Sequence, residues 1–341
     1  MEMKRIILLL VVCGSAGVAG AQDFSKVDSW LEANAPRMGG RAVLMVEKDG
    51  KIVYSRAVND RLLADKYTPE TRQRIASCSK WLSAALVMTF VDEGKLRLDD
   101  TVGYYLPVLS AHGKGNITVR ECLSHLTGIK EPSLWKSIAE MRGVRTMDEA
   151  IEKIAEMPME GAPGTVFRYS NAGLQIAGAI LEKISGQSFG QLFLERIAKP
   201  LGMINTDFGD RQVALPAGGA SSTAEDYMHF LEMVRNRGVY HSVRILSEHS
   251  VEEMEKNRIG TDVRIGYSPA GAAMGEVGYG YGEWTMGPGV VSSPGLFGAF
   301  PWVDNGRGYC AFLMVYYLDN RGKQERDVQL MRLVNEALQQ P

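Results

Sequence analysis

The spacing of hydrophobic residues changes along the chain and divides it into regions of different character. Near the start, residues 41–46 and 51–58 are rich in apolar and β-branched side chains and flank an Asp49-Gly50 pair. This arrangement predicts a β-hairpin, because Asp-Gly readily adopts the positive φ angles that a short hairpin turn requires. A helix is expected before it, over residues 24–34, and a Gly39-Gly40 break separates the two.

The segment from residue 79 to 93 is apolar around nearly its whole circumference and ends at Gly94. A helix with this pattern is buried rather than amphipathic. Between about residues 100 and 257 the pattern favours helices joined by polar loops. The candidate helices cover residues 118–126, 147–157, 172–184, 188–197, 223–237 and 248–256.

After Gly260 the helical spacing gives way to interleaved glycines and aromatic residues. Two strands are expected over residues 295–303 and 309–317, and a helix over 323–339 closes the chain. Strands at both ends around a helical middle predict an α+β sandwich, with an antiparallel sheet built from both termini and flanked by helices. We expect the sheet part over about residues 22–76 and 265–341, and the inserted helical part over about residues 77–264.

The composition is that of a globular protein, with 45% hydrophobic and 23% charged residues among 341. The 38 basic and 40 acidic residues nearly cancel, which argues against a nucleic-acid partner or a polybasic membrane-binding surface. Nothing in the sequence indicates an oligomeric state.

The first 21 residues have the order of a secretory signal. Lys4 and Arg5 form a basic start, residues 6–12 are apolar, and small residues lead to Ala19-Gly20-Ala21. A membrane span needs about 20 apolar residues, far more than this run offers. Cleavage after Ala21 is therefore expected, which predicts a periplasmic or secreted protein with no membrane span of its own.

Cleavage would remove Cys13 and leave an odd number of cysteines, Cys78, Cys122 and Cys310. Buried free thiols are expected, although one pair could form. A lipoprotein attached through Cys13 is a weaker alternative, because Val12 stands where a small residue is preferred.

The first motif with chemical meaning is S-x-x-K, formed by Ser77 and Lys80 at the start of the buried helix. Side chains three residues apart lie on one helix face, and the helix N-terminus favours anionic character at the serine. Burial lowers the pKa of a lysine, so its neutral amine, which can accept a proton, forms more readily. A second S-x-x-K begins at Ser133, but it follows Pro132 and is explained by a helix N-cap.

The second motif is Y-x-N, formed by Tyr169 and Asn171 just before an apolar helix. A tyrosine hydroxyl can relay protons when a neighbouring cation lowers its pKa. Asn171 could orient Lys80 and donate to a substrate carbonyl. Taken alone, the motif is better explained by a packed tyrosine and an asparagine N-cap.

In this order, the two motifs resemble those of the class C β-lactamase family, which also includes D-Ala-D-Ala carboxypeptidases and esterases. The likeness covers nearly all of the chain after the signal and includes residues 95–107, 117–128, 200–203 and 218–226. It implies a β-lactamase/transpeptidase-like fold, with Ser77 as the nucleophile that forms an acyl-enzyme. It also implies that Lys80 and Tyr169 handle the proton, and we interpret His125, within one of these stretches, as structural.

The family's third motif, usually K-T-G on a strand beside the site, is where this chain departs. The matching place is Ser293-Pro294-Gly295, followed by Leu296. The resemblance implies an oxyanion hole formed by the backbone N–H groups of Ser77 and Leu296. The residues expected to contact the substrate are Asn171, Ser293 and Gly295.

Ser293 carries no charge, whereas the family's lysine helps bind the carboxylate of β-lactams and of peptidyl-D-Ala-D-Ala. A charge-assisted hydrogen bond contributes about 1.5–3 kcal/mol, against about 1 kcal/mol for a neutral one. We therefore favour an esterase-like or amide-hydrolysing enzyme that acts on a small molecule without a metal or organic cofactor. The alternatives are a β-lactamase or D-Ala-D-Ala carboxypeptidase, with an arginine from elsewhere replacing the lysine, and a non-catalytic binding or sensing module.

Overall fold

The computed structural model describes residues 22–133, 136–137, 139, 143–210, 213–319 and 321–339. The candidate signal of residues 1–21 lies outside the described residues, as do Leu134 and Trp135 of the second S-x-x-K.

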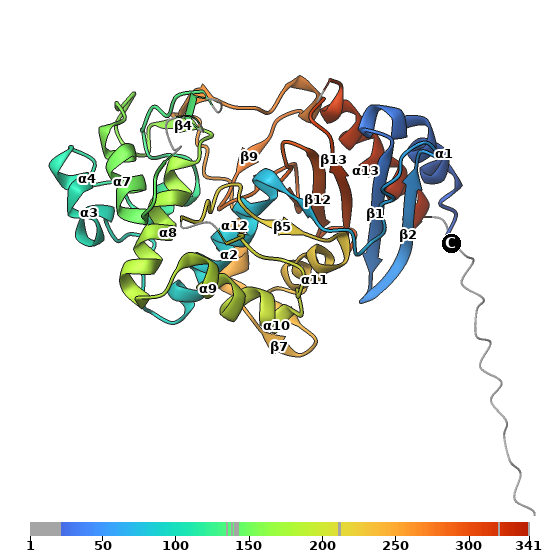
Figure 1. The fold of residues 1–341 in the computed structure, drawn as a ribbon, viewed down its shortest axis with the longest axis horizontal. Coiled ribbons are helices and arrows are strands. Elements are labelled where there is room, and N and C mark those ends of the chain that lie inside the picture. Colours follow the sequence, from blue (N-terminus) through green and yellow to red (C-terminus); the bar gives the residue numbers. More distant parts are fainter. Residues whose placement is uncertain are drawn as a thin grey trace, which may run out of the picture.

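A seven-stranded antiparallel sheet extends from the middle of the molecule to its right-hand end in Figure 1. Its order is β2-β1-β13-β12-β11-β10-β9, so the first two strands of the chain lie beside the last. Every neighbouring pair in this sheet is antiparallel. The strands are β1 (Arg41–Lys48), β2 (Lys51–Asn59), β9 (Gly278–Tyr279), β10 (Trp284–Thr285), β11 (Val290–Ser292), β12 (Gly298–Asp304) and β13 (Tyr309–Tyr316).

The predicted hairpin is confirmed as β1 and β2. Asp49 and Gly50 at its turn have φ angles of 54° and 73°, the left-handed values that the Asp-Gly pair was expected to supply.

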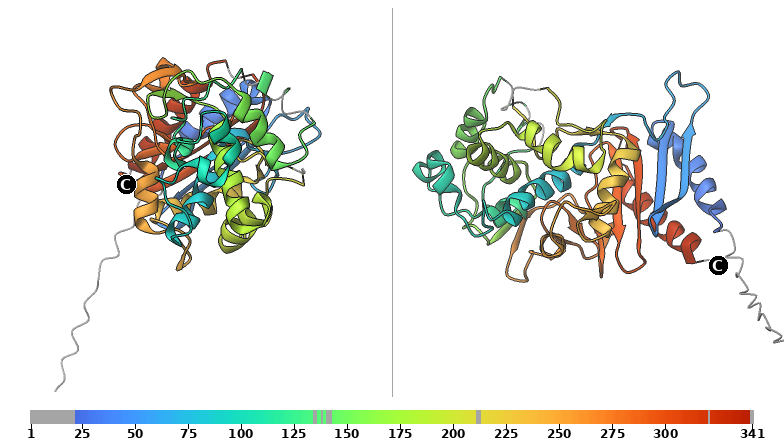
Figure 2. Two further views of the ribbon diagram at one scale, coloured as in Figure 1. Left: turned by 90° about the vertical axis from the view of Figure 1, so that its left-hand side faces the viewer. Right: turned by 90° about the horizontal axis from the view of Figure 1, so that it is seen from below.

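Helices cover both faces of this sheet (Figure 2). On one face, α1 (Ser25–Asn34) and α13 (Lys323–Gln339) bury Trp30 and Leu330 against the strands. On the other, α11 (Ala224–Arg235) packs against β1, β12 and β13, and α2 (Ser79–Asp92) belongs to the same large core. Strands β1, β12 and β13 are therefore buried on both faces, whereas most of β2 is exposed or partly exposed.

The rest of the chain forms the mostly helical region between the terminal segments, on the left of Figure 1. Its helices are α3 (Val102–Tyr105), α4 (Pro107–Ala111), α5 (Val119–Leu123), α7 (Met147–Glu156), α8 (Ala172–Ser185), α9 (Phe189–Phe193), α10 (Lys199–Leu201) and α12 (Glu248–Glu255). Three small strand pairs accompany them, β3 (Gln73–Arg74) with β5 (Ser221–Ser222), β4 (Val166–Arg168) with β8 (Arg264–Tyr267), and β6 (Val239–Tyr240) with β7 (Val243–Arg244). The predicted fold class, an α+β sandwich with its sheet built from both chain ends, is confirmed.

Three element boundaries differ from the prediction by three residues or more. The helix expected over 118–126 ends at Leu123, and His125 soon after has a positive φ of 60°. The strand expected from residue 295 begins at Gly298, whose N–H donates to the Gly295 carbonyl and closes a tight turn. The helix expected over 188–197 is α9 followed by a π-helical turn, Leu194–Ala198.

The cysteines match the expectation of buried thiols. Cys78, Cys122 and Cys310 are all free and buried. Within the described part of the chain, no helix has both the length and the apolar character needed to cross a bilayer.

Candidate active site

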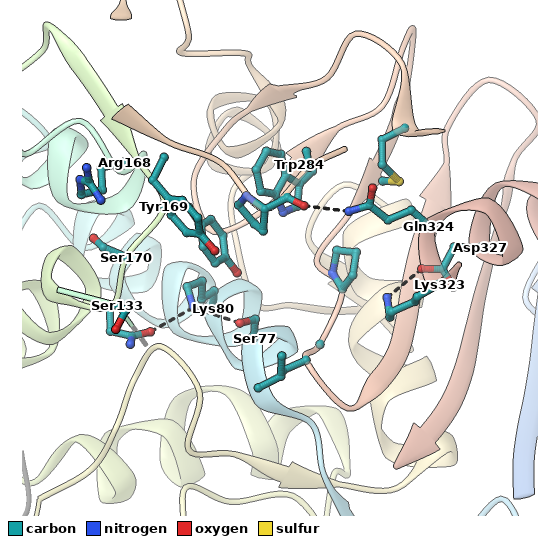
Figure 3. A pocket seen from close by; sticks show the side chains of 18 of the residues that line it. Ser77, Lys80, Ser133, Arg168, Tyr169, Ser170, Trp284, Lys323, Gln324 and Asp327 are labelled. Carbon is teal, nitrogen blue, oxygen red and sulfur yellow. Dashed lines mark hydrogen bonds and ion pairs between the residues drawn. The ribbon is translucent and has the colours of Figure 1, made fainter. Parts of the chain in front are cut away.

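Ser77 lies in a tight turn that joins β3 to α2. Ala76, just before it, has a φ of 45°, a left-handed value that is unfavourable for alanine. The Ile75 N–H donates to the Ala220 carbonyl at 3.1 Å and holds the turn from the other side. This bend places Ser77 at the N-terminal end of α2, on the wall of a cavity of about 640 Å³ (Figure 3).

Lys80 is completely buried one helical turn further on. Its Nζ donates to Ser77 Oγ at 3.2 Å, to Asn171 Oδ1 at 3.4 Å and to the Ala217 carbonyl at 2.7 Å. Burial lowers the pKa of Lys80 to about 7, although the nearby negative charge of Glu131 opposes this shift. Near neutral pH a substantial fraction of Lys80 is therefore uncharged and able to accept a proton.

Tyr169 reaches the same point from the loop between β4 and α8. Its ring stacks on Trp284 with centroids 5.5 Å apart, and Lys80 Nζ lies 4.7 Å from the centroid of the tyrosine ring. Burial raises the pKa of Tyr169, and a hydrogen bond with the Ser77 side chain offsets only part of the rise. The direction is opposite to the lowered pKa that a proton relay through an ionised tyrosine would need, because burial removes the hydroxyl from water and disfavours its anion. Tyr169 therefore stays protonated and can donate.

His125 supports this arrangement from behind, which agrees with its interpretation as a structural residue. Its Nδ1 accepts from the Ser170 N–H at 3.4 Å, which assigns the ring proton to Nε2, 3.0 Å from Tyr279 Oη. Its ring centroid lies 4.6 Å from that of Tyr169. Burial lowers the pKa of His125 well below its usual range, and the Lys80 charge adds to this effect. A neutral His125 thus holds Tyr169 in place.

Asn171 is the N-cap residue of α8 and faces Lys80 through its side-chain oxygen. The other side of its amide, Nδ2, lies 3.3 Å from Glu131 Oε1. Glu131 Oε2 accepts from the backbone N–H groups of Asn171 at 2.6 Å and Ala172 at 3.0 Å. Glu131 was not singled out in the sequence, although it follows the family-like stretch that ends at Gly128.

The third-motif segment lines another part of the cavity, but its residues divide differently from the expectation. Pro294, Gly295 and Leu296 line the cavity. Ser293 is 2% exposed, and its hydroxyl lies 2.9 Å from the Gly282 carbonyl and 3.2 Å from that of Ser77. The Ser293 hydroxyl is directed at backbone carbonyls and stabilises this part of the wall. The geometry therefore does not support the substrate contact expected for Ser293.

Gly295 is needed for a reason that the sequence did not reveal. A Cβ atom at this position would lie 2.4 Å from the Ile75 carbonyl oxygen and 3.2 Å from Cys78 Sγ. The glycine therefore lets the third-motif segment pack directly against the turn that carries Ser77.

A cation also reaches this wall, from the N-terminal end of α13. Lys323 lines the cavity, and its Nζ donates to Asp327 Oδ2 at 2.7 Å. Both Lys323 and an arginine, Arg168, therefore line the cavity, and each is already paired with a carboxylate. A lysine at the start of a long C-terminal helix gave no sequence signal of its own.

The cavity has two chemically different sides (Figure 3). Polar groups gather beside α8, where Glu131, Arg168 and Asn171 lie. The opposite side combines an apolar and aromatic surface with the polar start of α13, and its residues are Tyr267, Pro269, Ala270, Met274, Trp284, Pro294 and Leu296, with Lys323, Gln324, Glu325 and Asp327. Such a cavity can hold a small molecule with an apolar group on one side of a carbonyl and a polar group on the other.

An antiparallel sheet flanked by helices, with a serine, a buried lysine and a tyrosine at one cavity, defines a serine hydrolase of the penicillin-recognising class. The chain belongs to the β-lactamase family, whose sequence profile matches residues 35–336.

Individual relatives agree with this assignment. The protein Rv1367c of Mycobacterium tuberculosis is 27% identical over 325 residues, which cover 76% of this chain and 79% of that protein. Esterase EstB of Burkholderia gladioli is 30% identical over 183 residues, 49% of this chain and 46% of the esterase. The crystal structure of a candidate β-lactamase from Bacteroides dorei has a TM-score of 0.81 at 27% identity, covering 94% of this chain and 100% of that one.

Proposed function

We propose that this protein is an exported serine hydrolase that acts through an acyl-enzyme on Ser77, with esterase-like or amide-hydrolysing specificity. The observation that carries the proposal is the 3.2 Å contact between Ser77 Oγ and Lys80 Nζ. Because burial lowers the pKa of Lys80 to about 7, this amine can accept the serine proton at neutral pH.

In the first half of the reaction, Ser77 Oγ forms a bond to the substrate carbonyl carbon while its proton moves to Lys80 Nζ. The carbonyl oxygen becomes an oxyanion, for which we propose the backbone N–H groups of Ser77 and Leu296 as donors. One such donor typically contributes about 3 kcal/mol to transition-state stabilisation. Collapse of the intermediate breaks the bond to the leaving group, and the proton reaches that group through the Tyr169 hydroxyl.

In the second half, water attacks the acyl carbon and the bond to Ser77 Oγ breaks. We assign proton acceptance from water to Lys80, with Tyr169 as the relay, because burial raises the pKa of the tyrosine and favours its protonated form. The products are a carboxylic acid and the leaving-group alcohol or amine, and Ser77 regains its proton.

The third-motif segment itself presents no charge to an acyl group. Pro294 and Leu296 stand near the place where the family's lysine is expected, and Ser293 is directed away from the cavity. The similarity to esterase EstB points in the same direction. An ester whose acyl group packs beside Trp284 is therefore the substrate class we favour.

Lys323 favours a second candidate, a β-lactamase or D-Ala-D-Ala carboxypeptidase. Its ammonium group could bind a substrate carboxylate, but it would have to share that role with Asp327 at 2.7 Å. Because Asp327 competes with a substrate carboxylate for Lys323, we favour an ester as the substrate.

One experiment separates these functions from a non-catalytic binding role. The purified protein is incubated in parallel with a p-nitrophenyl ester, a penicillin and a fluorophosphonate probe, and turnover and intact mass are measured for wild type and Ser77→Ala. We expect ester turnover and a fluorophosphonate adduct in wild type alone. Rapid penicillin turnover with little ester turnover would favour the second candidate. Absence of any adduct on wild type, or an adduct that persists in Ser77→Ala, would overturn the role of Ser77.

Export is tested separately. The order of residues in positions 1–21 supports cleavage after Ala21 and a periplasmic or secreted location. N-terminal sequencing of the protein from fractionated cells should find Gln22 as its first residue outside the cytoplasm. A cytoplasmic protein that keeps Met1 contradicts this part of the proposal.

A further inference from the structure

Glu131 is a buried carboxylate at the edge of the catalytic cavity, and the reaction described above does not use it. It is 6% exposed and accepts hydrogen bonds from four groups on two segments of the chain. The donors are the backbone N–H of Asn171 at 2.6 Å, the backbone N–H of Ala172 at 3.0 Å, Asn171 Nδ2 at 3.3 Å and Ser137 Oγ at 2.6 Å. A carboxylate held this closely has a fixed position and orientation.

This position determines which way the Asn171 amide faces. A carboxylate only accepts hydrogen bonds, so Asn171 must present its Nδ2 group to Glu131. The side-chain oxygen of Asn171 then faces Lys80 Nζ, at 3.4 Å. If the amide were reversed, an N–H₂ group would face the ammonium and no hydrogen bond to it could form.

Glu131 also contributes a negative charge to the surroundings of Lys80. Burial lowers the pKa of Lys80, whereas the nearby Glu131 carboxylate and the Cys78 thiol raise it. Neutral His125 and the protonated Tyr169 hydroxyl face it without a charge. Glu131 is thus the main charge that can balance a Lys80 ammonium formed during the reaction.

We propose that Glu131 is a positioning residue for Ser77 chemistry, which turns the Asn171 oxygen toward Lys80 and balances the positive charge that Lys80 acquires. The inference rests on the proposed roles of Ser77 and Lys80. It requires Glu131 to act through both its hydrogen bonds and its charge, whereas a purely structural residue would act through stability alone.

The test is the pH dependence of fluorophosphonate labelling of Ser77, measured as a second-order rate for wild type, Glu131→Gln, Glu131→Asp and Ser137→Ala. Glutamine keeps the size of the side chain but removes the charge. We expect its acidic limb to move to lower pH by on the order of one unit, because the Lys80 ammonium loses its balancing charge. The plateau rate should fall about tenfold, because Lys80 becomes a weaker base.

Two further variants keep the test decisive if Glu131→Gln does not fold. Glu131→Asp retains the charge but places it farther from Lys80. Its acidic limb should therefore also move to lower pH, by about a few tenths of a unit. Ser137→Ala removes one hydrogen bond to Glu131 and leaves the charge, so its limb should coincide with that of wild type. Circular dichroism establishes that each variant is folded.

The possible results separate the proposed role of Glu131 from the proposed hydrolase function on which it rests. If wild type is not labelled on Ser77, the proposed function itself is lost. If wild type is labelled with an acidic limb and folded Glu131→Gln or Glu131→Asp has the same limb, Glu131 only caps α8 and the inference is overturned. An equal shift in Ser137→Ala also overturns it, because the charge would then not be the cause.

Discussion

Lys80 shows how a common side chain acquires a special property from its surroundings. An exposed lysine is charged at neutral pH, with a pKa near 10.4 in model peptides. In this protein Lys80 is fully buried, and burial lowers its pKa to about 7. The cost of burying the charge is therefore what makes the amine useful as a base.

A pH dependence follows directly. Only the neutral amine accepts the Ser77 proton, so kcat/KM for a p-nitrophenyl ester should rise with pH through about 7 and then level off. Stopped-assay rates over a pH series in constant ionic strength measure this limb. Lys80→Met should remove the limb and lower kcat/KM by about a thousandfold. A limb centred near the pKa of an ordinary carboxyl would contradict the role of Lys80.

Glu283 is as completely buried as Lys80, but its burial affects the stability of the protein rather than catalysis. Neither of its carboxyl oxygens makes a hydrogen bond of ordinary geometry among the described residues. Burial raises its pKa well above the usual range, the charge of Glu255 adds to this, and the Trp81 indole offsets part of it. In the folded protein Glu283 is therefore held in the protonated form.

Glu283→Gln should stabilise the protein increasingly as pH rises. The unfolded chain releases the Glu283 proton above about pH 4.3, whereas the folded chain keeps it, so wild type loses stability between the unfolded and folded pKa values. Glutamine has no proton to lose. The difference in Tm between variant and wild type, measured from about pH 5 to about pH 8, should therefore grow with pH. A constant difference would show that Glu283 is ionised in the folded state.

At the scale of elements, long periodic segments could be predicted and short ones could not. The prediction for the last helix, residues 323–339, agrees with α13 (Lys323–Gln339), because its length carries several full turns of periodic pattern. Strands β9 (Gly278–Tyr279) and β10 (Trp284–Thr285) have two residues each, too few for any period. Only pairing within the sheet makes them strands.

The contact between Gly295 and the Ser77 turn gives a prediction at this scale. Alanine would place a Cβ atom 2.4 Å from the Ile75 carbonyl oxygen, so the two backbone segments would have to separate. We expect Gly295→Ala to lower the free energy of unfolding by about 1–3 kcal/mol and to lower kcat/KM by at least about tenfold. Denaturant unfolding and ester kinetics measure the two effects.

A matched control is Gly190→Ala in α9, where an added Cβ meets no atom within 4 Å. It should leave kcat/KM unchanged and leave stability equal or slightly higher, since alanine favours helix. Equal effects of the two substitutions would contradict the importance of the close approach at Gly295.

At the scale of the whole molecule, the sheet separates the two largest hydrophobic cores of the described residues. The larger contains α2 and most of the helical region beside the site. The smaller lies between the sheet and the pair α1 and α13, and includes Leu330. We call this smaller core the outer core. Because α13 packs on it and also carries Lys323, which lines the cavity, α13 connects the outer core to the wall of the active site.

Leu330→Ala tests the contribution of the outer core. The side chain is fully buried, so its truncation should lower the free energy of unfolding by about 2–5 kcal/mol. Well below the Tm, kcat/KM for the ester should stay within about twofold of wild type, since the cavity lining is unchanged. Leu62→Ala, at a side chain that is 93% exposed, should change neither quantity. A loss of activity in folded Leu330→Ala would show that the outer core also sets the cavity geometry.

The sequence by itself determined the fold class, the hairpin, the principal helices and the pairing of Ser77 with Lys80, because these depend on local periodicity and on spacing within one helix. Only the tertiary structure decided what surrounds them. Glu131 and Lys323 come to the cavity from distant parts of the chain, and Ser293 is directed away from it. Burial and charge at the site arise from segments far apart in sequence, and no local pattern records which of them meet.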